Sequence, residues 1–366
     1  MAQTRHIMKK IFLGLALLLS FTGAVFAQTS MLATLSHEGE ITVFYGPEAL
    51  RKAHAAATHG DVISLSAGKF YSVDITKAIT LRGAGTVTDV EKNIHPTNII
   101  GDFNIDIEEG VTQSLTIEGI YTKYDIEIIS GLKNAYFIKN RLGKINYCSN
   151  TASYNNNHFI HCKIPYGFTA QYNSGRNSIF FTNSYIYSLK PNLCTIIANN
   201  SIICSSIGSN SLPTLQSLSN CTIYNSILVG DNSGASHNVL PVDCNVYNCI
   251  ITNVTQSNIS GYSYEQIFNN TDKNNSRVIK DLSSVFKTAS VGYNTGIVAI
   301  DVENLELLDE VKSNYIGTDS TEIGIYGGLY PYSPITTGPQ ITKCNVAPRA
   351  SADGKLSIEI EVKAGE

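Results

Sequence analysis

The sequence predicts an all-β fold: a single-stranded right-handed parallel β-helix (a solenoid) with an N-terminal capping helix and a short C-terminal β tail. Two observations predict it. Only 15% of the 366 residues are charged, against about a quarter in ordinary domains, and the place of the charges is taken by Asn, Ser, Thr and 20 Tyr. This composition is typical of a β-solenoid or barrel. The second observation, an asparagine that recurs about once per coil between short apolar segments, favours the solenoid.

The chain begins with the pattern of a secretory signal peptide. A basic head within the first ten residues is followed by an apolar body from Ile11 to Phe26 and a small-residue cleavage motif that ends at Ala27. We therefore expect residues 1–27 to be removed and the protein to be secreted, periplasmic or at the cell surface. A membrane anchor is the alternative, but the apolar body is short and ends in a cleavage motif. No other stretch predicts a membrane span.

Composition also limits the partners. The formal net charge is −4 and no basic stripe occurs, so nucleic acid is an improbable partner. Apolar residues make up 43% of the chain, which excludes general disorder. We expect an exported monomer.

The recurring pattern is apolar-x-Asn-x-apolar, with successive asparagines about 17 to 26 residues apart. If each repeat is one coil, equivalent positions stack every ~4.8 Å. An Asn at a bend tolerates the left-handed backbone conformation, and its amide can bond to the copies above and below it. We therefore predict an asparagine ladder at a corner between two short strands of each coil: Asn140, Asn157, Asn183, Asn200, Asn225 and Asn248.

The same alternation predicts which neighbours face the core. Cys204, Cys221 and Cys244 take the inward phase, and Ser226 and Cys249 the outward one. We expect the eight cysteines to be mostly reduced, with room for one disulfide.

A β-sandwich with Asn in ordinary turns is the alternative fold. Its hairpins favour Asn-Gly and Asp-Gly, yet Asn-Gly is absent here and Asp-Gly occurs once.

The N-terminal part predicts the start of the solenoid. Residues 47–57 have the spacing of a short amphipathic helix, which would protect the exposed edge of the first coil. A Gly60-Asp61 turn, a strand at Val62–Leu65 and an Ala67-Gly68 turn follow.

This stretch closely resembles the opening of the pectin-lyase-like right-handed parallel β-helix family. The family pattern "GDVIxLxAGxY" is matched by Gly60, Asp61, Val62, Ile63, Leu65, Ala67, Gly68 and the Phe70-Tyr71 pair. Residues 79–86 look like the next coil, and residues 318–332 resemble the closing segment of secreted β-helix proteins from Bacteroidota-type bacteria. The resemblance covers roughly residues 45–335. It implies the fold and says little about chemistry, because this fold carries lyases, hydrolases, adhesins and inert spikes.

The expected organisation follows: signal peptide 1–27, N-terminal cap segment 28–58, parallel β-helix 59–335 and C-terminal β tail 336–366. In the tail, Leu356, Ile358, Ile360 and Val362 alternate with polar residues, which predicts a one-sided strand. We expect it to pair with a strand near residues 341–346. The tail either docks on the solenoid or lends its edge to a partner.

No familiar catalytic motif occurs. The chain has no nucleophile elbow, zinc helix or Cys-x-x-Cys pair. It also lacks the paired Asp-Asp, Gly-His-Gly and Arg-Ile-Lys of the polygalacturonase-like branch, which puts hydrolysis of that type in doubt.

The best polar constellation lies near the first coils. Ile105 and Ile126 take the inward phase 21 residues apart, about one coil, so two outward acidic rows are expected to lie side by side. These rows are the predicted binding residues: Asp102, Asp106, Glu108, Asp125 and Glu127. Such carboxylates could hold Ca²⁺, the candidate ion although no cofactor is certain, through Asp106, Glu108, Asp125 and Glu127. The alternative is a solvated acidic face.

In β-helix lyases a Ca²⁺ lies beside a Lys or Arg base, so the resemblance makes Lys144 the candidate base, with Lys123 and Arg141 nearby. Two function classes remain open. The first is a secreted protein that binds a complex polysaccharide along its flank, where Tyr, Asn and Ser suit sugars. The second is a Ca²⁺-dependent polysaccharide lyase acting on acidic glycans. A surface structural protein or adhesin is a weaker third, and enzyme status stays open.

Overall fold

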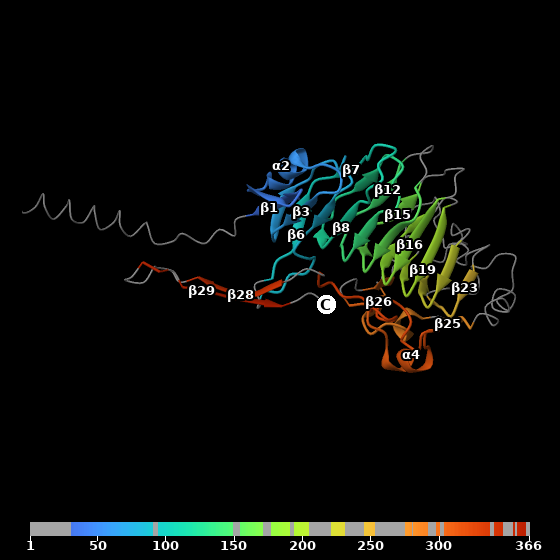
Figure 1. Cartoon of the computed structure of the whole chain (residues 1–366). Helices are drawn as coiled ribbons and strands as arrows, with labels where there is room; N and C mark the ends of the chain where they lie inside the picture. Colours follow the sequence, from blue (N-terminus) through green and yellow to red (C-terminus); the bar gives the residue numbers. More distant parts are fainter. Residues whose placement is uncertain are drawn as a thin grey trace, which may run out of the picture. The chain divides into compact units, whose positions relative to one another are not determined.

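The computed structural model describes most of the chain, and within it the protein is a parallel β-helix (Figure 1). The described residues are 31–90, 94–148, 154–170, 177–190, 194–204, 221–230, 245–252, 275–279, 281–291, 298–300, 304–336, 340–346, 354–355 and 357–363. The chain separates into two units, Met1–Ser30 and Met31–Glu366. The expected signal peptide, 1–27, lies outside the described residues.

Three stacks of short strands form the coils, here called sheets A, B and C. Sheet A has 11 strands in the order β2 (Glu40–Tyr45), β1 (Leu32–His37), β3 (Val62–Leu65), β5 (Thr80–Arg82), β8 (Thr116–Glu118), β11 (Tyr136–Ile138), β13 (Asn157–Ile160), β16 (Ser178–Thr182), β19 (Thr195–Asn199), β21 (Cys221–Tyr224) and β23 (Asn245–Tyr247). From β3 onward every pair in it is parallel, and the strands follow in chain order, as Figure 1 shows. This confirms the predicted fold class.

Sheet B comes in two parts. The first contains β4 (Gly68–Tyr71), β6 (Thr97–Ile100) and β9 (Ile120–Tyr121), and the second β14 (Lys163–Ile164), β17 (Tyr185–Tyr187), β20 (Ile202–Cys204), β22 (Ile227–Val229), β24 (Ile250–Thr252) and β25 (Arg277–Ile279). Arg141 joins the two parts through single parallel bridges to Tyr121 and Lys163.

Sheet C has five strands: β7 (Phe103–Ile105), β10 (Ile126–Ile128), β12 (Ile145–Tyr147), β15 (Phe168–Ala170) and β18 (Leu189–Lys190). The remaining elements are α2 (Ala49–Ala56), the 3₁₀ turn η3 (Leu282–Ser284), β26 (Ala289–Val291), β27 (Val298–Ile300), α4 (Asp309–Asn314), β28 (Gln340–Val346) and β29 (Ile358–Lys363). The tail strands β28 and β29 pair as an antiparallel hairpin, as expected.

The core is a set of columns that run from coil to coil. Phe137, Phe159 and Phe181 are buried in one column of sheet A, and the rings of Phe137 and Phe159 stack 4.5 Å apart and nearly parallel. Phe168 of sheet C meets the last two rings edge-on. Each coil therefore buries its apolar residues against copies above and below, and repetition makes the core continuous.

The N-terminal cap differs in part from the expectation. Helix α2 lies within the predicted range and buries Ala49, Leu50, Ala53 and His54. The edge of the first parallel strand, β3, is instead covered by the hairpin β1–β2, through antiparallel pairs such as Leu35↔Ile63. The sequence analysis did not predict this hairpin.

A corner of left-handed residues runs between sheets A and B. In successive coils the residue after the sheet A strand has a positive φ, between 46° and 54° in this set: Lys139, His161, Asn183, Asn200, Asn225 and Asn248. Asn275, two residues before β25 of sheet B, has a positive φ of 55° as well. Their amides form part of a ladder, since Asn275 Nδ2 donates to Asn248 Oδ1 (2.7 Å) and Asn248 Nδ2 to Asn225 Oδ1 (2.9 Å). The predicted row of buried asparagines is thus present from Asn183 to Asn248, but amide-to-amide bonds begin only at Asn225, and the amide of Asn200 has no hydrogen-bond partner among the described residues.

Two predicted members of the ladder lie elsewhere. Asn140 stands one residue after the corner, because Lys139 holds the left-handed position in its coil. Asn157 lies at the start of β13, where its side chain bonds to Ala135 N and Leu132 O. Both are buried and hydrogen-bonded, but they belong to different rows.

A second ladder follows directly after the corner. The residues in this row, which we call the small-residue row, are buried: Asn140, Cys162, Ser184, Ser201, Ser226, Cys249 and Ser276. The backbone N–H of one coil donates to the side chain of the next, as from Ser201 to Ser226 Oγ (3.0 Å) and from Cys249 to Ser276 Oγ (3.1 Å). The row therefore satisfies the N–H groups that the turn leaves without a strand partner.

This row corrects the outward phase predicted for Ser226 and Cys249. Both are buried, because the left-handed residue before them interrupts the two-residue alternation. Among the cysteines whose side chains the structure describes, Cys148, Cys162, Cys194, Cys204 and Cys249 are free, in line with the mostly reduced state expected. Cys244 lies outside the described residues.

Candidate binding site

A C-terminal segment far along the chain lies against the corner. We call residues 315–336 the strap. Its backbone accepts two hydrogen bonds from Asn183 Nδ2, at Ile325 O (2.9 Å) and Gly327 O (2.6 Å), and one from Asn248 Nδ2, at Ile316 O (2.9 Å). Thr318 N donates to Asn225 Oδ1 (3.0 Å). The amides of Asn183, Asn225 and Asn248 therefore bind the strap, and those of Asn225 and Asn248 also bind each other.

From Asn183 the strap continues toward the N-terminal coils. His161 Nε2 donates to Tyr330 O (2.9 Å), and burial lowers the pKa of this imidazole. A Cβ added at Gly119 or at Gly85 would meet the methyl group of Thr336, so the strap also reaches the first coils.

A row of aromatic and basic residues lies beside this part of the strap. Tyr121, Arg141 and Lys163 occupy one position of sheet B in three successive coils and are joined by parallel bridges. Each stands two residues after a corner residue, namely Gly119, Lys139 and His161, all of which have positive φ. The turn at the corner thus sets the direction of all three side chains in the same way.

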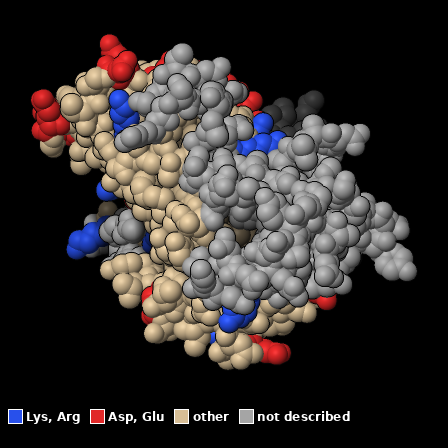
Figure 2. Space-filling view, turned by 90° about the vertical axis from the view of Figure 1, so that its right-hand side faces the viewer, with Lys and Arg blue, Asp and Glu red and all other residues tan. Residues whose placement is uncertain are grey.

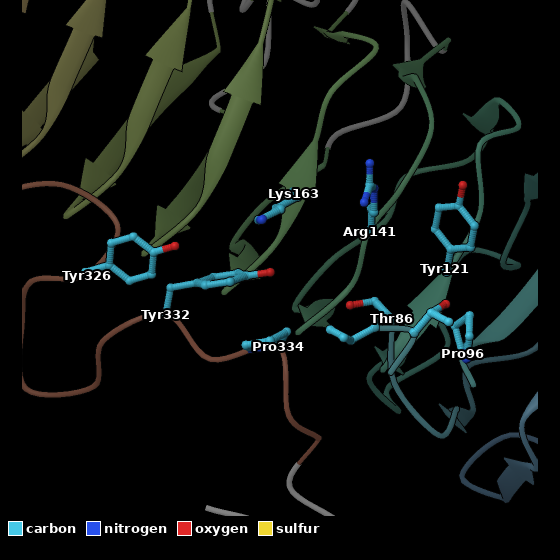
Figure 3. Close-up of a pocket in the computed structure, with 10 residues that line it drawn as sticks. Thr86, Pro96, Tyr121, Arg141, Lys163, Tyr326, Tyr332 and Pro334 are labelled. Atoms are coloured by element: carbon cyan, nitrogen blue, oxygen red, sulfur yellow. The ribbon is translucent and has the colours of Figure 1, made fainter. Parts of the chain in front are cut away.

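Between this row and the strap lies a cavity of about 530 Å³. Its lining residues are Thr86, Val87, Thr88, Pro96, Tyr121, Arg141, Lys163, Tyr326, Tyr332 and Pro334. Figure 3 shows Tyr121, Arg141 and Lys163 following one another across the coils, with Tyr332 and Pro334 of the strap facing them and Thr86 and Pro96 at the other end.

Both cations of the cavity lie over tyrosine rings. Arg141 Cζ is 5.6 Å from the centre of the Tyr121 ring, and Lys163 Nζ is 5.2 Å from that of Tyr332. Lys163 is only 6% exposed, so its charge is held in surroundings of lower polarity than water, where an anion is attracted more strongly. Burial raises the pKa of Tyr326, which keeps its hydroxyl protonated as a donor. The cavity thus combines two cations, three aromatic rings and hydroxyl groups.

The predicted acidic rows are arranged differently. Their inward neighbours are buried as expected, but Ile126 pairs with Phe103 and Ile128 with Ile105, so the register differs by two residues from the predicted one. Asp125 consequently lies beside Asp102, whose Oδ1 accepts a hydrogen bond from Asp125 N (2.9 Å).

The other predicted ligands are separated by the same shift. Glu127 pairs with Asn104 and Asn146 rather than with another carboxylate, while Asp106 lies beyond the paired residues of β7. Glu108 lines a different cavity, of about 590 Å³, together with Glu109 and Lys133. In the described part of the chain, no group of three or more His, Cys, Asp or Glu side chains could hold a metal ion.

Of the three basic residues considered as a lyase base, only Arg141 lines the cavity. Lys144 precedes β12 of sheet C, and its backbone oxygen accepts a hydrogen bond from Ile126 N (2.8 Å). The sequence analysis missed Lys163, Tyr326 and Tyr332. The signal for Lys163 was its place two residues after a corner residue, the same as that of Arg141.

The face drawn in Figure 2 shows no large patch of like-charged described residues. There the described atoms belong mostly to uncharged residues, with Lys, Arg, Asp and Glu scattered around them.

Among the described residues, no helix is both long and apolar enough to cross a membrane. Comparisons with protein-family profiles, with curated proteins and with solved structures found no match to this chain.

Proposed function

We propose that the chain is a secreted β-helix protein that binds a complex polysaccharide carrying acidic groups, and that the sugar chain lies in the cavity between sheet B and the strap. One observation carries the proposal: Arg141 and Lys163 stand in adjacent coils of one cavity, each over a tyrosine ring. Secretion rests on the signal-peptide pattern, and membership of the pectin-lyase-like family on the motif at residues 60–71.

The chemistry of the cavity suits an acidic sugar. A guanidinium can bind a carboxylate or sulfate through two parallel hydrogen bonds, and a lysine ammonium adds a point charge. Tyrosine rings offer flat apolar surfaces for the C–H faces of sugar rings, and their hydroxyls can bond to sugar hydroxyls. Because adjacent coils are about 4.8 Å apart, the two cations can meet negative groups that repeat at a similar interval along a polymer.

The lyase alternative finds less support. Its candidate base, Lys144, belongs to sheet C rather than to the cavity, and its four candidate calcium ligands are dispersed. The calcium site therefore stays a prediction of the sequence analysis. No contact in the described residues favours the structural or adhesin alternative.

A retention experiment tests the proposal. The protein is run through gels that contain a polyuronate, a sulfated polysaccharide or a neutral polysaccharide. We expect the two acidic polymers to retard it and Lys163→Ala and Arg141→Ala each to weaken binding about tenfold, the equivalent of about 1.4 kcal/mol. Arg141→Lys should weaken it less, because the charge remains while the paired hydrogen bonds are lost.

Lys144→Ala is the matched control, since it removes an equal charge from a different sheet. It should leave retention unchanged, whereas a lyase would lose its ultraviolet-absorbing unsaturated products in this variant. Thermal unfolding of each variant shows whether the fold is intact. Equal retention of wild type, Lys163→Ala and Arg141→Ala would contradict the proposed site.

A further inference from the structure

The hairpin β1–β2 makes β2 the outer edge of sheet A. Its pairing with β1 is unbroken from Leu32↔Tyr45 to His37↔Glu40. The two turn residues, Glu38 and Gly39, both have positive φ (49° and 88°), as a tight two-residue hairpin requires. The strand β2 is therefore held in an extended form by its own hairpin.

The backbone of β2 is directed outward at every second residue. In an antiparallel pair, residues alternately bond to the partner strand and point away from it. Gly46 N donates to Met31 O (2.7 Å), so Gly46 and the residues in phase with it face β1. The alternate residues turn their N–H and C=O groups toward the outer edge: Ile41, Val43 and Tyr45. No described strand pairs with this edge.

These three residues also carry exposed apolar side chains. Ile41 is 70% exposed, Val43 40% and Tyr45 64%. Proteins commonly guard an edge strand with lysine, proline or a bulge, and β2 contains none of these. Backbone groups without a strand partner in the described chain thus coincide with an apolar surface, which is the arrangement of a strand-pairing interface.

We propose that β2 pairs with β2 of a second copy of this chain, antiparallel and about a twofold axis at Val43. Ile41 and Tyr45 lie equally far from Val43, so the axis pairs Ile41 of one copy with Tyr45 of the other, twice, and Val43 with itself. All three outward-directed residues of both copies are then hydrogen-bonded. Sheet A continues from one copy into the next.

Charge favours the antiparallel arrangement. Glu40 is the only charged residue of β2, and the twofold axis holds the two copies of it at opposite ends of the paired strands. A parallel pairing would place them side by side, where like charges repel. This homodimer departs from the monomer expected from the sequence, in which the hairpin was not predicted.

Sedimentation of the purified protein over a range of concentrations tests the proposal. We expect a dimer in the wild type and a monomer in Val43→Lys. Thr222→Lys is the matched control: it adds the same charge to the outer face of β21, far from β2 along the sheet, and should stay dimeric. Val43→Pro removes only an N–H that points to the outer edge, so it should also give a folded monomer with unchanged far-ultraviolet dichroism.

A wild-type protein that stays monomeric throughout the series would overturn the proposal. A dimer that persists in both Val43→Lys and Val43→Pro would also overturn it, because the contact would then lie elsewhere. If Val43→Pro is unfolded, Val43→Lys together with its control still decides the outcome.

Discussion

Replacing Ser226 by alanine should destabilise the protein, although serine to alanine is usually a mild change. Ser226 is fully buried in the small-residue row, and its Oγ accepts a hydrogen bond from Ser201 N (3.0 Å). Without the hydroxyl, the N–H of Ser201 has no acceptor inside the protein. A buried donor left in this state costs about 1–3 kcal/mol.

The other bond of the hydroxyl adds little to this cost. Ser226 Oγ also donates to Tyr224 O, but that oxygen accepts a second hydrogen bond from Asn200 N (3.2 Å) and so stays bonded in the variant. Removal of one oxygen atom leaves a void much smaller than a methyl group. The expected loss in the free energy of unfolding is therefore about 1–3 kcal/mol, from one unsatisfied N–H group.

The row itself provides the comparison. In the next coil Cys249 occupies the same position, and Ser226 N donates to its Sγ (3.4 Å). Ser226→Cys should therefore cost about 1 kcal/mol or less, since sulfur is a weaker acceptor but still accepts. The exposed change Ser283→Ala should stay within about 0.5 kcal/mol of the wild type.

Urea unfolding followed by far-ultraviolet dichroism gives the free energy of unfolding of the wild type and of all three variants. The expected order of stability is wild type and Ser283→Ala, then Ser226→Cys, then Ser226→Ala. If Ser226→Ala were as stable as Ser283→Ala, the hydrogen bond from Ser201 N to the Ser226 hydroxyl would not contribute to stability. If Ser226→Cys were as unstable as Ser226→Ala, the defect would be one of volume or shape, and the hydrogen-bond ladder would not be its cause.

Three further predictions concern the corner, the cap and the thiols. Asn225→Leu removes the bonds to Thr318 and to the neighbouring amide, so it should cost about 1–3 kcal/mol and speed amide hydrogen exchange in the strap; unchanged exchange would contradict the docking role. A hydrogen bond to Asp61 raises the pKa of His37, so this pair stabilises below about pH 6.5 and the effect is lost as pH rises through the folded pKa. The melting-temperature gap between wild type and His37→Ala should therefore shrink from pH 6 to pH 9, and a constant gap would refute the linkage. Burial raises the pKa of Cys162 to about 12, so iodoacetamide at pH 8 should label it in urea and not in the native protein.

Local periodicity was enough to predict the coil and much of its core. In β21, for example, the inward phase of Ile223 is visible because the polar Thr222 separates it from Cys221, and both Cys221 and Ile223 are buried. The coil of β11 is different, since Tyr136, Phe137 and Ile138 are all apolar or aromatic and either phase fits. The pattern placed Ile138 inside, whereas Phe137 is the buried residue, and the corner was therefore assigned one residue late, to Asn140.

The register between the two acidic rows was wrong for another reason, although their strands β7 and β10 do lie side by side. Alternation fixes which side of a strand faces inward, and it did so for β7 and β10. It does not fix which residues of two coils lie side by side, because that depends on the length of the turns between them. A shift of two residues preserves the inward phase and still moves Asp125 from its expected partner to Asp102.

The binding site could not be predicted because its two walls are distant in sequence. The contact between His161 and Tyr330 spans 169 residues, and no local pattern reports it. What the sequence does contain is the row of corner residues to which the strap binds. From Asn183 to Asn248 the corner is built of asparagines. The amides of Asn183, Asn225 and Asn248 bond to the strap or to a neighbouring amide, whereas that of Asn200 has no hydrogen-bond partner among the described residues.

The position of the cavity follows from where that row of asparagines ends. In the coils of Gly119 and Lys139 the left-handed conformation is kept, but no corner amide is present to hold the strap. Beside these coils the strap faces the side chains two residues past the corner, Tyr121 and Arg141, across open space. Replacing Lys139 by Asn should therefore preserve the backbone, offer the strap a new amide and reduce access to the basic row. The strap is thus hydrogen-bonded to the corner at Asn183, Asn225, Asn248 and His161, and a cavity remains between it and the side chains of Tyr121, Arg141 and Lys163.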